Sequence, residues 1–492
     1  MSSRIPLYSA EQVKSGEVEA ANAKSISMYQ LMLKAGKSVF EVMIQQYPKC
    51  KRVLVVCGGG NNGGDGYVVA KLALEAGMQV LVWQSVDKEK LSGDALAAYN
   101  EYLSLGGVIG VPDFSKKLDF DCIIDAILGT GINGKVRENT AQIIEKINNS
   151  DIETISVDLP SGLSSNTGSC LGVSVKAQHT VSFIGLKCGL FTGQARAYTG
   201  EVHFCGLDVE DVFDQQNLPK AYLLNSAQDF GPLTKRNKAA HKGHHGKALI
   251  IGGNQGMGGA ALLSSQACMR VGAGLTALLT HSENTMASTI TCPEVMASAW
   301  QDERSVEQRV NQWCDCIAIG PGLGTNEVSK QMFDRVCALN LNKVLDADAL
   351  NLLASNPNKD DLRILTPHPG EAARLLSCSI NEIEGDRYSA IKKLHDQYGG
   401  VMVLKGAGTL VFDGKHTYVC NAGNPGMATA GMGDVLTGVI LGLLAQGENL
   451  ISAAVKGVMI HSIAADKEAK INGERGLCAS DLLPYIRILA ND

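Results

Sequence analysis

The sequence predicts an α/β protein of two domains. Short apolar runs alternate with helical stretches through both halves of the 492-residue chain. Strands that are apolar on both faces are typical of parallel sheets covered by helices. The alternation breaks over 210–240, where Pro, Asn, Asp and Lys interrupt any sustained period. We therefore expect one domain at 1–220 and another at 221–492, with the boundary falling between 215 and 230.

The elements follow one another in the same order in both halves. Ser9 with Gln12 forms a capping-box pattern that predicts an N-terminal helix. In the first half we expect strands at 53–57, 79–83, 121–128 and 154–160, and helices over about 65–76 and 94–105. In the second half we expect strands at 247–253, 275–280 and 316–322, and helices over 258–272 and 431–446. Between these last elements lie KVLDADAL, LRILTPHPGE and VMVLKGAGTLVFD, which also contain strands.

Composition narrows the possible function classes. Hydrophobic residues make up 45% of the chain and charged residues 19%, which is ordinary for a globular protein. The net charge of −6 gives no electrostatic reason to expect nucleic acid or an anionic membrane as a partner. The first residues lack a signal-peptide apolar segment, and apolar runs such as 435–445 are too short to span a bilayer. We expect a cytoplasmic protein whose 14 cysteines are reduced thiols.

A glycine-rich loop, GGGNNGGDG at 58–66, follows a predicted strand and opens a helix. Free backbone N–H groups and the positive end of a helix dipole suit a phosphate or pyrophosphate. Gly58, Gly60 and Gly63 match G-x-G-x-x-G, but no clear acidic residue ends the next strand, so an ordinary NAD dehydrogenase is not supported. Two Asn and one Asp in the same loop favour a ligand site over a simple turn.

Polar groups also follow two later strands of the first half. Asp125, and Asp158 with Ser161, occupy strand ends, where open parallel sheets bind ligands. Asn62, Asp125 and Ser161 are hard oxygen donors that suit an alkali or alkaline-earth cation. The alternative is that the two aspartates only cap loops.

The segments GGGNNGGDG, DAILGTG, VDLPSGL and TVSFIGLKCGL, in this order, resemble the NAD(P)H-hydrate epimerase family over about residues 1–215. The opening YSAEQVKSGEVEAANAKSISMYQLMLKAG is similar to the N-terminal helices of that family. The resemblance implies a Rossmann-like parallel sheet and a potassium ion held by Asn62, Asp125 and Ser161. It implies that the hydrated nucleotide contacts Asn61, Asn62, Gly63, Gly64, Asp65, Gly129, Thr130, Gly131, Ile132, Asn133, Gly134, Lys135 and Asp158.

The same resemblance assigns acid–base chemistry to Asp158 and Lys187. Inverting a carbon that bears a hydroxyl and an enamine-like nitrogen requires proton transfer. A carboxylate and an ammonium group in a shared, partly dry cleft can exchange that proton. Which of the two is the base stays open, and a plain surface lysine is the alternative for Lys187.

The second half carries GNPGMATAGMGDVLTG at 423–438, which places glycines and then Asp434 at the start of an apolar helix. The N–H groups of 431–434 can form an anion hole for a transferring phosphoryl group, with Asp434 as base toward a substrate hydroxyl. A helix-capping role for Asp434 is the alternative. LKGAGTLV turns through glycines and can place Lys405, Gly406 and Thr409 against an anionic ligand. P-loop and protein-kinase signatures are absent from the sequence, which excludes both chemistries.

This set resembles the NAD(P)H-hydrate dehydratase family, whose fold is a ribokinase-like α/β sandwich, over about residues 235–490. The motifs that carry the resemblance are KGHHGKALIIGG, GMGGAALLSSQACMRVGAGL, GPGLG, DADALN, TPHPGEAARLL, LKGAGT and NPGMATAGMGDVLTG. It implies hydrate contacts from Ala260, Gly322, His368 and Asp434, with Asp434 as catalytic base. It implies adenine-nucleotide contacts from Lys405, Gly406, Ala407, Gly408, Thr409 and Gly433. Met432 replaces a Thr that is usual in the family, which removes a hydroxyl contact but keeps the backbone N–H groups.

Together the two resemblances imply a bifunctional repair enzyme for nicotinamide nucleotides. Such an enzyme epimerises the R and S forms of hydrated NADH and NADPH and dehydrates the S form with ADP or ATP. We expect K⁺ in the N-terminal domain, Mg²⁺ with the nucleotide, small-molecule partners, no nucleic acid or membrane, and a homo-oligomer. The choice between ADP and ATP stays open, although an unadorned fused chain resembles prokaryotic members, which usually take ADP.

Two other functions fit parts of the sequence. A ribokinase-like small-molecule kinase would share the glycine-rich Asp434 motif but leaves NNGGDG in the first domain without a role. A nucleotide sensor without catalysis would bind hydrated NAD(P)H and not turn it over. The presence of both Asp158 and Lys187 disfavours the sensor.

Overall fold

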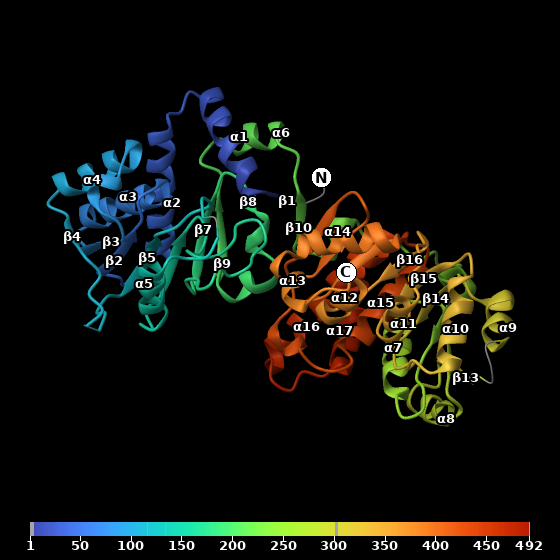
Figure 1. The fold of residues 1–492 in the computed structure, drawn as a ribbon. Helices are drawn as coiled ribbons and strands as arrows, with labels where there is room; N and C mark the ends of the chain where they lie inside the picture. The colour runs from blue at the N-terminus through green and yellow to red at the C-terminus, as the bar shows by residue number, and fades with distance from the viewer. Residues whose placement is uncertain (1–3, 116, 133, 301–303, 492) are drawn as a thin grey trace. The chain divides into compact units, whose positions relative to one another are not determined.

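The computed structural model describes residues 4–115, 117–132, 134–300 and 304–491, which fold as two compact units. The N-terminal unit is Pro6–Ala221, and the C-terminal unit is Tyr222–Asp492 together with Arg4 and Ile5. Each unit contains a sheet flanked by helices (Figure 1). The predicted α/β class is therefore confirmed.

The N-terminal unit is built on a seven-stranded sheet in the order β4-β3-β2-β5-β6-β7-β9. Every adjacent pair of these strands is parallel, as predicted. The order reverses between β2 and β5, and open α/β sheets bind ligands at the carboxyl ends of strands beside such a reversal. The strands are β2 (Arg52–Cys57), β3 (Gln79–Gln84), β4 (Val108–Gly110), β5 (Cys122–Ala126), β6 (Thr154–Val157), β7 (His179–Phe183) and β9 (Glu201–Cys205). A parallel ladder joins β1 (Ile5–Tyr8) to β8 (Leu186–Lys187).

Helices cover both faces of this sheet because the strands are apolar on both sides. Val53 and Val55 pack with α2, α3 and α4, whereas Leu54 and Val56 pack with α5 on the opposite face. The helices are α1 (Ala10–Ala23), α2 (Met28–Gln46), α3 (Asn61–Glu75), α4 (Gly93–Ser104), α5 (Glu138–Asn148) and α6 (Glu210–Gln216). The capping box predicted at Ser9 is present at the start of α1.

The glycine-rich segment after β2 departs from the prediction. We expected residues 61–65 to form a loop, but α3 begins at Asn61, so these residues form the start of the helix. Glycine lowers helix propensity, which is why the sequence indicated a loop. Close packing accounts for the difference. A Cβ placed on Gly64 would lie 2.6 Å from Cε of Met32, and one on Gly66 would lie 2.6 Å from Cβ of Ala126.

The C-terminal unit has a larger sheet in the order β13-β12-β11-β14-β15-β16-β17-β18-β19-β10. It is parallel from β13 to β17, β18 runs antiparallel to both of its neighbours, and β19 is parallel to β10. The strands are β10 (Ala221–Leu224), β11 (Lys247–Ile251), β12 (Leu275–Thr280), β13 (Met296–Ala299), β14 (Cys316–Ile319), β15 (Asn342–Leu345), β16 (Arg363–Leu365), β17 (Val401–Leu404), β18 (Leu410–Phe412) and β19 (Thr417–Cys420). Here the order reverses between β11 and β14.

The core of this unit is centred on α15, whose residues from Val435 to Ala445 are all buried. This helix confirms the one predicted over 431–446, and it packs against α7 and α16. Such all-round apolar character is typical of a helix enclosed on every side. The helices are α7 (Gly258–Val271), α8 (Ser282–Thr291), α9 (Arg304–Trp313), α10 (Glu327–Cys337), α11 (Asp348–Ser355), α12 (Pro369–Leu375), α13 (Ile380–Gly385), α14 (Arg387–Tyr398), α15 (Met432–Ala445), α16 (Leu450–Asn472) and α17 (Leu482–Leu489).

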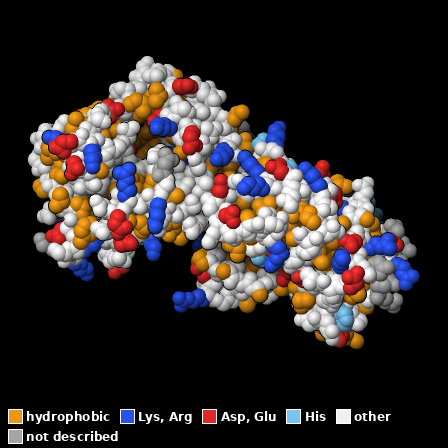
Figure 2. Space-filling view, viewed as in Figure 1, with side chains coloured by type: hydrophobic (Ala, Val, Ile, Leu, Met, Phe, Trp, Pro, Cys, Tyr) orange, Lys and Arg blue, Asp and Glu red, His pale blue; other side chains and the backbone are white. Residues whose placement is uncertain are grey.

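The surface carries charges of both signs. In the face shown in Figure 2, Lys and Arg side chains are interspersed with Asp and Glu on each unit. Among the residues that the structure describes, no helix combines the length and the apolar character needed to cross a membrane.

Candidate active sites

Asp125 lies at the carboxyl end of β5 and is fully buried. It accepts hydrogen bonds from Ser156 Oγ at 2.8 Å, Ser161 Oγ at 2.6 Å, Ser161 N at 2.8 Å and Ile127 N at 3.3 Å. Burial raises the pKa of Asp125, and these hydrogen bonds oppose the rise. The structure thus brings two of the three predicted cation ligands, Asp125 and Ser161, into direct contact.

Asn62 approaches the same place from α3. Ser161 Oγ accepts a hydrogen bond from Leu128 N at 2.8 Å, and a Cβ placed on the next residue, Gly129, would lie 3.3 Å from Asn62 Oδ1. Nδ2 of Asn62 is buried and has no hydrogen-bond partner among the described residues. The oxygen and nitrogen of an Asn amide can exchange places by a half rotation. A carboxamide oxygen in that orphaned position would suit a hard cation, so the residues fit K⁺.

Asp158, which follows β6, and Lys187, the last residue of β8, form an ion pair in the interior of the unit. The Lys187 side chain is only 1% exposed, and its Nζ also donates to Phe183 O at 3.0 Å and to Ser182 Oγ at 3.3 Å. The alternative of a plain surface lysine is therefore wrong. Asp158 has a positive φ of 65°, and its backbone N donates to Val181 O at 2.8 Å. Such a conformation is costly for a residue with a side chain and is typical of functional sites.

Two more carboxyl groups share the electrostatic environment of this pair. Burial raises the pKa of Glu17, on α1, to about 7; the charge of Lys187 lowers it and that of Asp158 raises it. Burial also raises the pKa of Asp65 well above its usual range, with further rises from Asp158 and Glu17. At neutral pH Glu17 can therefore hold a proton, so the cluster contains both a proton donor and proton acceptors. Glu17 was not among the predicted residues.

Residues 129–135, the second segment predicted to contact the nucleotide, form no helix or strand where they are described, and only part of the segment lies beside the Asn62 side chain. Gly129 contacts Asn62, whereas Gly131, Gly134 and Lys135 are exposed. The Lys135 side chain lies instead against Gly172, where an added Cβ would be 3.0 Å from its Cγ. Thr130 and Ile132 are half-buried, and Asn133 lies outside the described residues.

In the C-terminal unit, Asp434 lies in the first turn of α15. The N-cap is Gly431, with a φ of 87°, and no side chain caps this helix, so the capping alternative for Asp434 is wrong. Burial raises the pKa of Asp434 to about 7, with a further rise from the charge of Asp346 that Lys405 opposes. A carboxyl group with a pKa near the working pH is well suited to act as a general base.

Lys405, after β17, is held beside Asp434 by buried acceptors. Its Nζ donates to Asp346 Oδ1 at 2.8 Å and lies 3.8 Å from Glu371 Oε2. Burial alone would lower the pKa of Lys405, but the charges of Asp346 and Glu371 raise it overall. A Cβ placed on Gly433 would lie 3.2 Å from Lys405 Nζ, so the predicted nucleotide residues Gly433 and Lys405 lie side by side.

Asp346, which lies in the motif DADALN, anchors this arrangement, and the sequence pattern alone predicts no role for it. It is 1% exposed and accepts hydrogen bonds from Thr366 Oγ1 and Thr437 Oγ1, each at 2.8 Å, in addition to Lys405. These donors come from the ends of β16 and β17 and from α15. One carboxylate therefore fixes three elements that surround Asp434.

The glycine turn at 405–409 is supported from behind by a buried arginine. Arg387 donates to Leu404 O at 3.1 Å and to Lys405 O at 3.0 Å. Gly406 has a φ of 134°, and a Cβ there would lie 3.0 Å from Nη1 of Arg387, so glycine is required. Thr409 Oγ1 donates to Gly406 O at 2.9 Å, Ala407 is exposed and Gly408 is buried.

The residues predicted to contact the hydrate surround the same cluster. A Cβ placed on Gly322 would lie 3.3 Å from Cβ of Ala260, at the reversal between β11 and β14. Ser264 Oγ contacts both Ala260 O, at 3.2 Å, and Asp434 O, at 2.8 Å, which ties α7 to α15. His368 caps α12, and its backbone N donates to Glu371 Oε2 at 2.8 Å, the carboxylate that faces Lys405.

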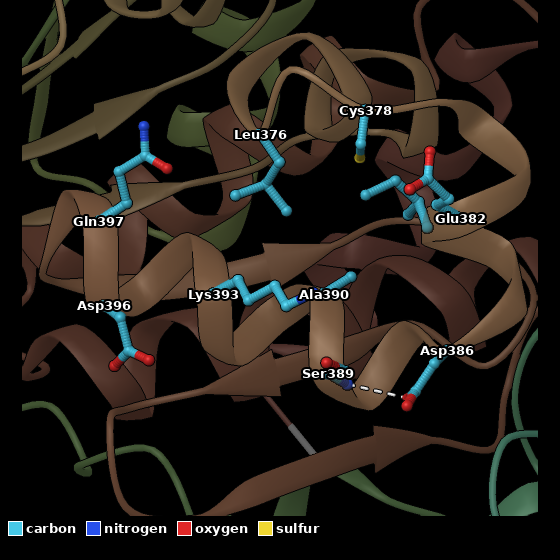
Figure 3. A pocket seen from close by; sticks show the side chains of 10 residues that line it. Leu376, Cys378, Glu382, Asp386, Ser389, Ala390, Lys393, Asp396 and Gln397 are labelled. Carbon is cyan, nitrogen blue, oxygen red and sulfur yellow. Dashed lines mark hydrogen bonds between the residues drawn. The ribbon is translucent and has the colours of Figure 1, made fainter.

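A hollow of about 540 Å³ elsewhere in this unit contains none of the predicted residues. It lies between α12, α13 and α14 (Figure 3), where Ser389 N donates to Asp386 Oδ1 at 2.9 Å. It is lined by Leu376, Cys378, Glu382, Ile383, Asp386, Ser389, Ala390, Lys393, Asp396 and Gln397. The chemistry of both units is concentrated instead at the carboxyl ends of the strands.

The fold and these sites define an enzyme with two α/β units, of which the second has the ribokinase-like arrangement. Residues 248–487 match the model of the NAD(P)H-hydrate dehydratase family, and residues 28–189 match that of the YjeF-related protein N-terminus. The bifunctional NAD(P)H-hydrate repair enzyme of Vibrio cholerae is 50% identical and is covered over 98% of each chain. That of Escherichia coli is 42% identical, covering 99% of this chain and 94% of the relative. The chain belongs to the family of bifunctional NAD(P)H-hydrate repair enzymes.

Solved structures resemble the C-terminal unit. The ADP/ATP-dependent NAD(P)H-hydrate dehydratase of Bacillus subtilis, co-crystallised with ATP and Mg²⁺, is 30% identical with a TM-score of 0.50. The match covers 54% of this chain and 96% of that chain. A ribokinase-like superfamily protein from Enterococcus faecalis is 29% identical with a TM-score of 0.51, covering 55% and 95%. The predicted family and fold class are thus confirmed, and the kinase alternative is not supported.

Proposed function

We propose that this chain repairs hydrated NADH and NADPH, with the epimerase at 1–220 and the ADP- or ATP-dependent dehydratase at 221–492. The observation that carries the proposal is the pair of buried acid–base clusters, one in each unit. Asp158 with Lys187 would serve the epimerase, and Asp434 with Lys405 would serve the dehydratase. Membership of the family indicates the substrate, and the two clusters contain acid–base groups that could transform it.

In the dehydratase, Asp434 takes the proton from the hydroxyl group of the hydrated nicotinamide ring. The hydroxyl oxygen attacks the terminal phosphorus, and the bond from that phosphorus to the rest of the nucleotide breaks, which gives AMP from ADP or ADP from ATP. Phosphate then leaves with the electron pair of the carbon–oxygen bond, and the neighbouring ring carbon loses a proton, restoring the double bond. Lys405 and the free N–H groups at the start of α15 stabilise the charge on the transferring phosphoryl group.

Magnesium usually binds through substrate phosphates and one or two carboxylates. Glu371, which faces Lys405 and is not otherwise assigned to the chemistry, is the carboxylate that would hold it, and the ion would share the phosphate charge. In the epimerase, Lys187 and Asp158 move the proton at the inverted carbon. Potassium on Asn62, Asp125 and Ser161 would supply a fixed positive charge beside the start of α3.

The test of this function is recovery of the absorbance of reduced nicotinamide from a mixed-epimer preparation of NADH hydrate. We expect full recovery with Mg²⁺, K⁺ and either ADP or ATP, and the comparison of the two nucleotides identifies the donor. Recovery that stops once the S form is consumed, and then follows the spontaneous epimerisation rate, would remove the epimerase from the proposal. No recovery with either nucleotide would contradict the whole proposal and favour the kinase alternative.

Lys405→Met is expected to raise the KM for the adenine nucleotide. Hydrogen bonds to charged groups contribute about 1.5–3 kcal/mol, which corresponds to about 10–150-fold in affinity. The measurement is the initial dehydration rate against nucleotide concentration. A matched control is Lys343→Met, which removes another buried lysine, paired with Asp360 at 2.9 Å. Because KM does not depend on the folded fraction, an equal rise in both variants would contradict the assignment.

Ser161→Ala is expected to abolish the dependence of epimerisation on potassium. The substitution removes one of three proposed ligands while the Asp125 carboxylate stays in place. The measurement is the epimerisation rate as KCl replaces choline chloride at constant ionic strength. Ser156→Ala, which removes the other hydroxyl bonded to Asp125, is the control and should keep the potassium response. Equal rates of the unmodified chain in the two salts would exclude a potassium role.

A further inference from the structure

Two histidines and a glutamate meet at the edge of the N-terminal sheet, away from the proposed epimerase site. Strands β7 and β9 are adjacent and parallel (Figure 1), and His179 pairs in register with Glu201. His203 follows Glu201 by two residues, so both side chains point to the same face of β9. His179 and Glu201 are the first residues of β7 and β9, whereas Asp158 follows the carboxyl end of β6 and Lys187 is the last residue of β8.

Their ligand atoms lie close enough together for one metal ion to contact all three. His179 Nδ1 lies 3.0 Å from His203 Nε2 and 3.7 Å from Glu201 Oε2. All three ligand atoms lie within 4.8 Å of one another. Tetrahedral zinc with bonds of about 2.0–2.1 Å separates its ligand atoms by about 3.3 Å, which falls between the two shorter distances. Within the described ranges, this is the one group of at least three His, Cys, Asp or Glu side chains with such spacing.

A neighbouring aromatic side chain holds the first imidazole in place. The ring of Tyr47 packs edge-on against His179 at 5.7 Å between centroids, and its hydroxyl group donates to Glu153 at 3.0 Å. His179 is thus held on one side by an ordered aromatic residue, with the half-buried His203 and the exposed Glu201 on the other.

We propose that His179, His203 and Glu201 form a binding site for one divalent transition-metal ion, with Zn²⁺ as the expected occupant. Two imidazoles and a carboxylate are common zinc ligands, and a fourth position would be left for water. The ion would join β9, the edge strand, to β7. A hydrogen bond between the two imidazoles is the alternative explanation for the short distance between His179 Nδ1 and His203 Nε2. It does not explain why the Glu201 carboxylate lies close to the same imidazole.

The test is calorimetric titration of the full chain with ZnCl₂ at neutral pH. We expect one tight site, which His203→Gln weakens by at least about 100-fold, because even indirect partners of metal ligands contribute about 10–100-fold. Glu201→Gln should weaken binding as well. The Glu201 side chain is 66% exposed, so Glu201→Gln is expected to fold normally. The test therefore remains valid even if His203→Gln fails to fold. Zinc should also raise the unfolding temperature of the unmodified chain more than that of either variant.

A matched control comes from another close pair of histidines. The rings of His241 and His244 stack at 3.6 Å in the C-terminal unit. His244→Gln should leave zinc affinity unchanged. Equal affinity of the unmodified chain and both site variants would overturn the proposal, as would loss of the tight site in His244→Gln. Because the three proposed ligands belong to neither proposed active site, neither result would alter the outcome of the repair assay.

Discussion

Asp434→Asn is expected to remove dehydration almost completely while leaving epimerisation intact. The amide keeps the size of the side chain but cannot accept the hydroxyl proton, and general-base catalysis is typically worth about 10²–10⁴-fold in rate. The measurement is kcat for NADH recovery from the S epimer at saturating nucleotide, with epimerisation of the R form measured on the same preparation. Loss of dehydration with retention of epimerisation would identify Asp434 as the catalytic base.

The control for this variant is Asp413→Asn, which changes a carboxyl group that caps the turn between β18 and β19. It should leave kcat unchanged. The pH dependence of the unmodified chain gives a second check. Since the pKa of Asp434 is raised to about 7, the group becomes protonated as the pH falls through 7 and can no longer accept a proton. The dehydration rate should therefore fall about tenfold per pH unit well below 7 and level off above it. A rate independent of pH down to 5 would contradict the assignment of Asp434.

Lys187→Met is expected to abolish epimerisation and to destabilise the N-terminal unit. The ammonium group is buried against Asp158, and removing one partner of a buried ion pair typically costs about 3–5 kcal/mol because the other charge is left uncompensated. Loss of acid–base chemistry should lower the epimerisation rate by about 10²–10⁴-fold. The measurements are the epimerisation rate above the spontaneous one and the free energy of unfolding. Dehydration of the S epimer should persist.

Asp158→Asn separates catalysis from stability in the same cluster. Asparagine keeps the hydrogen-bonding shape toward Lys187, so it costs less stability than Lys187→Met while removing the carboxylate. A variant that folds but does not epimerise would assign chemistry to Asp158. Full epimerase activity in both variants would contradict the role of this pair and direct attention to Glu17 and Asp65.

The sequence was most informative where a motif lies on one continuous segment. The capping box at Ser9 and the helix after Gly431 depend on neighbouring residues, and both predictions are confirmed. The predicted start of α3 was wrong because helix propensity depends only on local sequence. The small size of Gly64 and Gly66 is required instead by contacts with Met32 and Ala126, which are distant in sequence.

Residues whose importance depends on distant partners were missed. Glu17 reaches the epimerase cluster from α1, far along the chain from Asp158. Asp346 lies in the motif DADALN, but its three partners come from three other segments. His179 and His203 are brought together only by the pairing of two strands. The burial of Lys187 could not be judged from the sequence either, because the local sequence does not show which side chains enclose its ammonium group.

The contacts of Asp346 also bear on how tightly and how quickly the second site exchanges its nucleotide. A lysine side chain loses about 1.5–2 kcal/mol of conformational freedom when it is immobilised. Here the protein's own contacts immobilise Lys405, so in the proposed nucleotide site that loss is part of folding and would not weaken the association with ADP or ATP. Preorganisation of this kind increases residence time, and it makes departure of the spent nucleotide a natural candidate for the step that limits turnover.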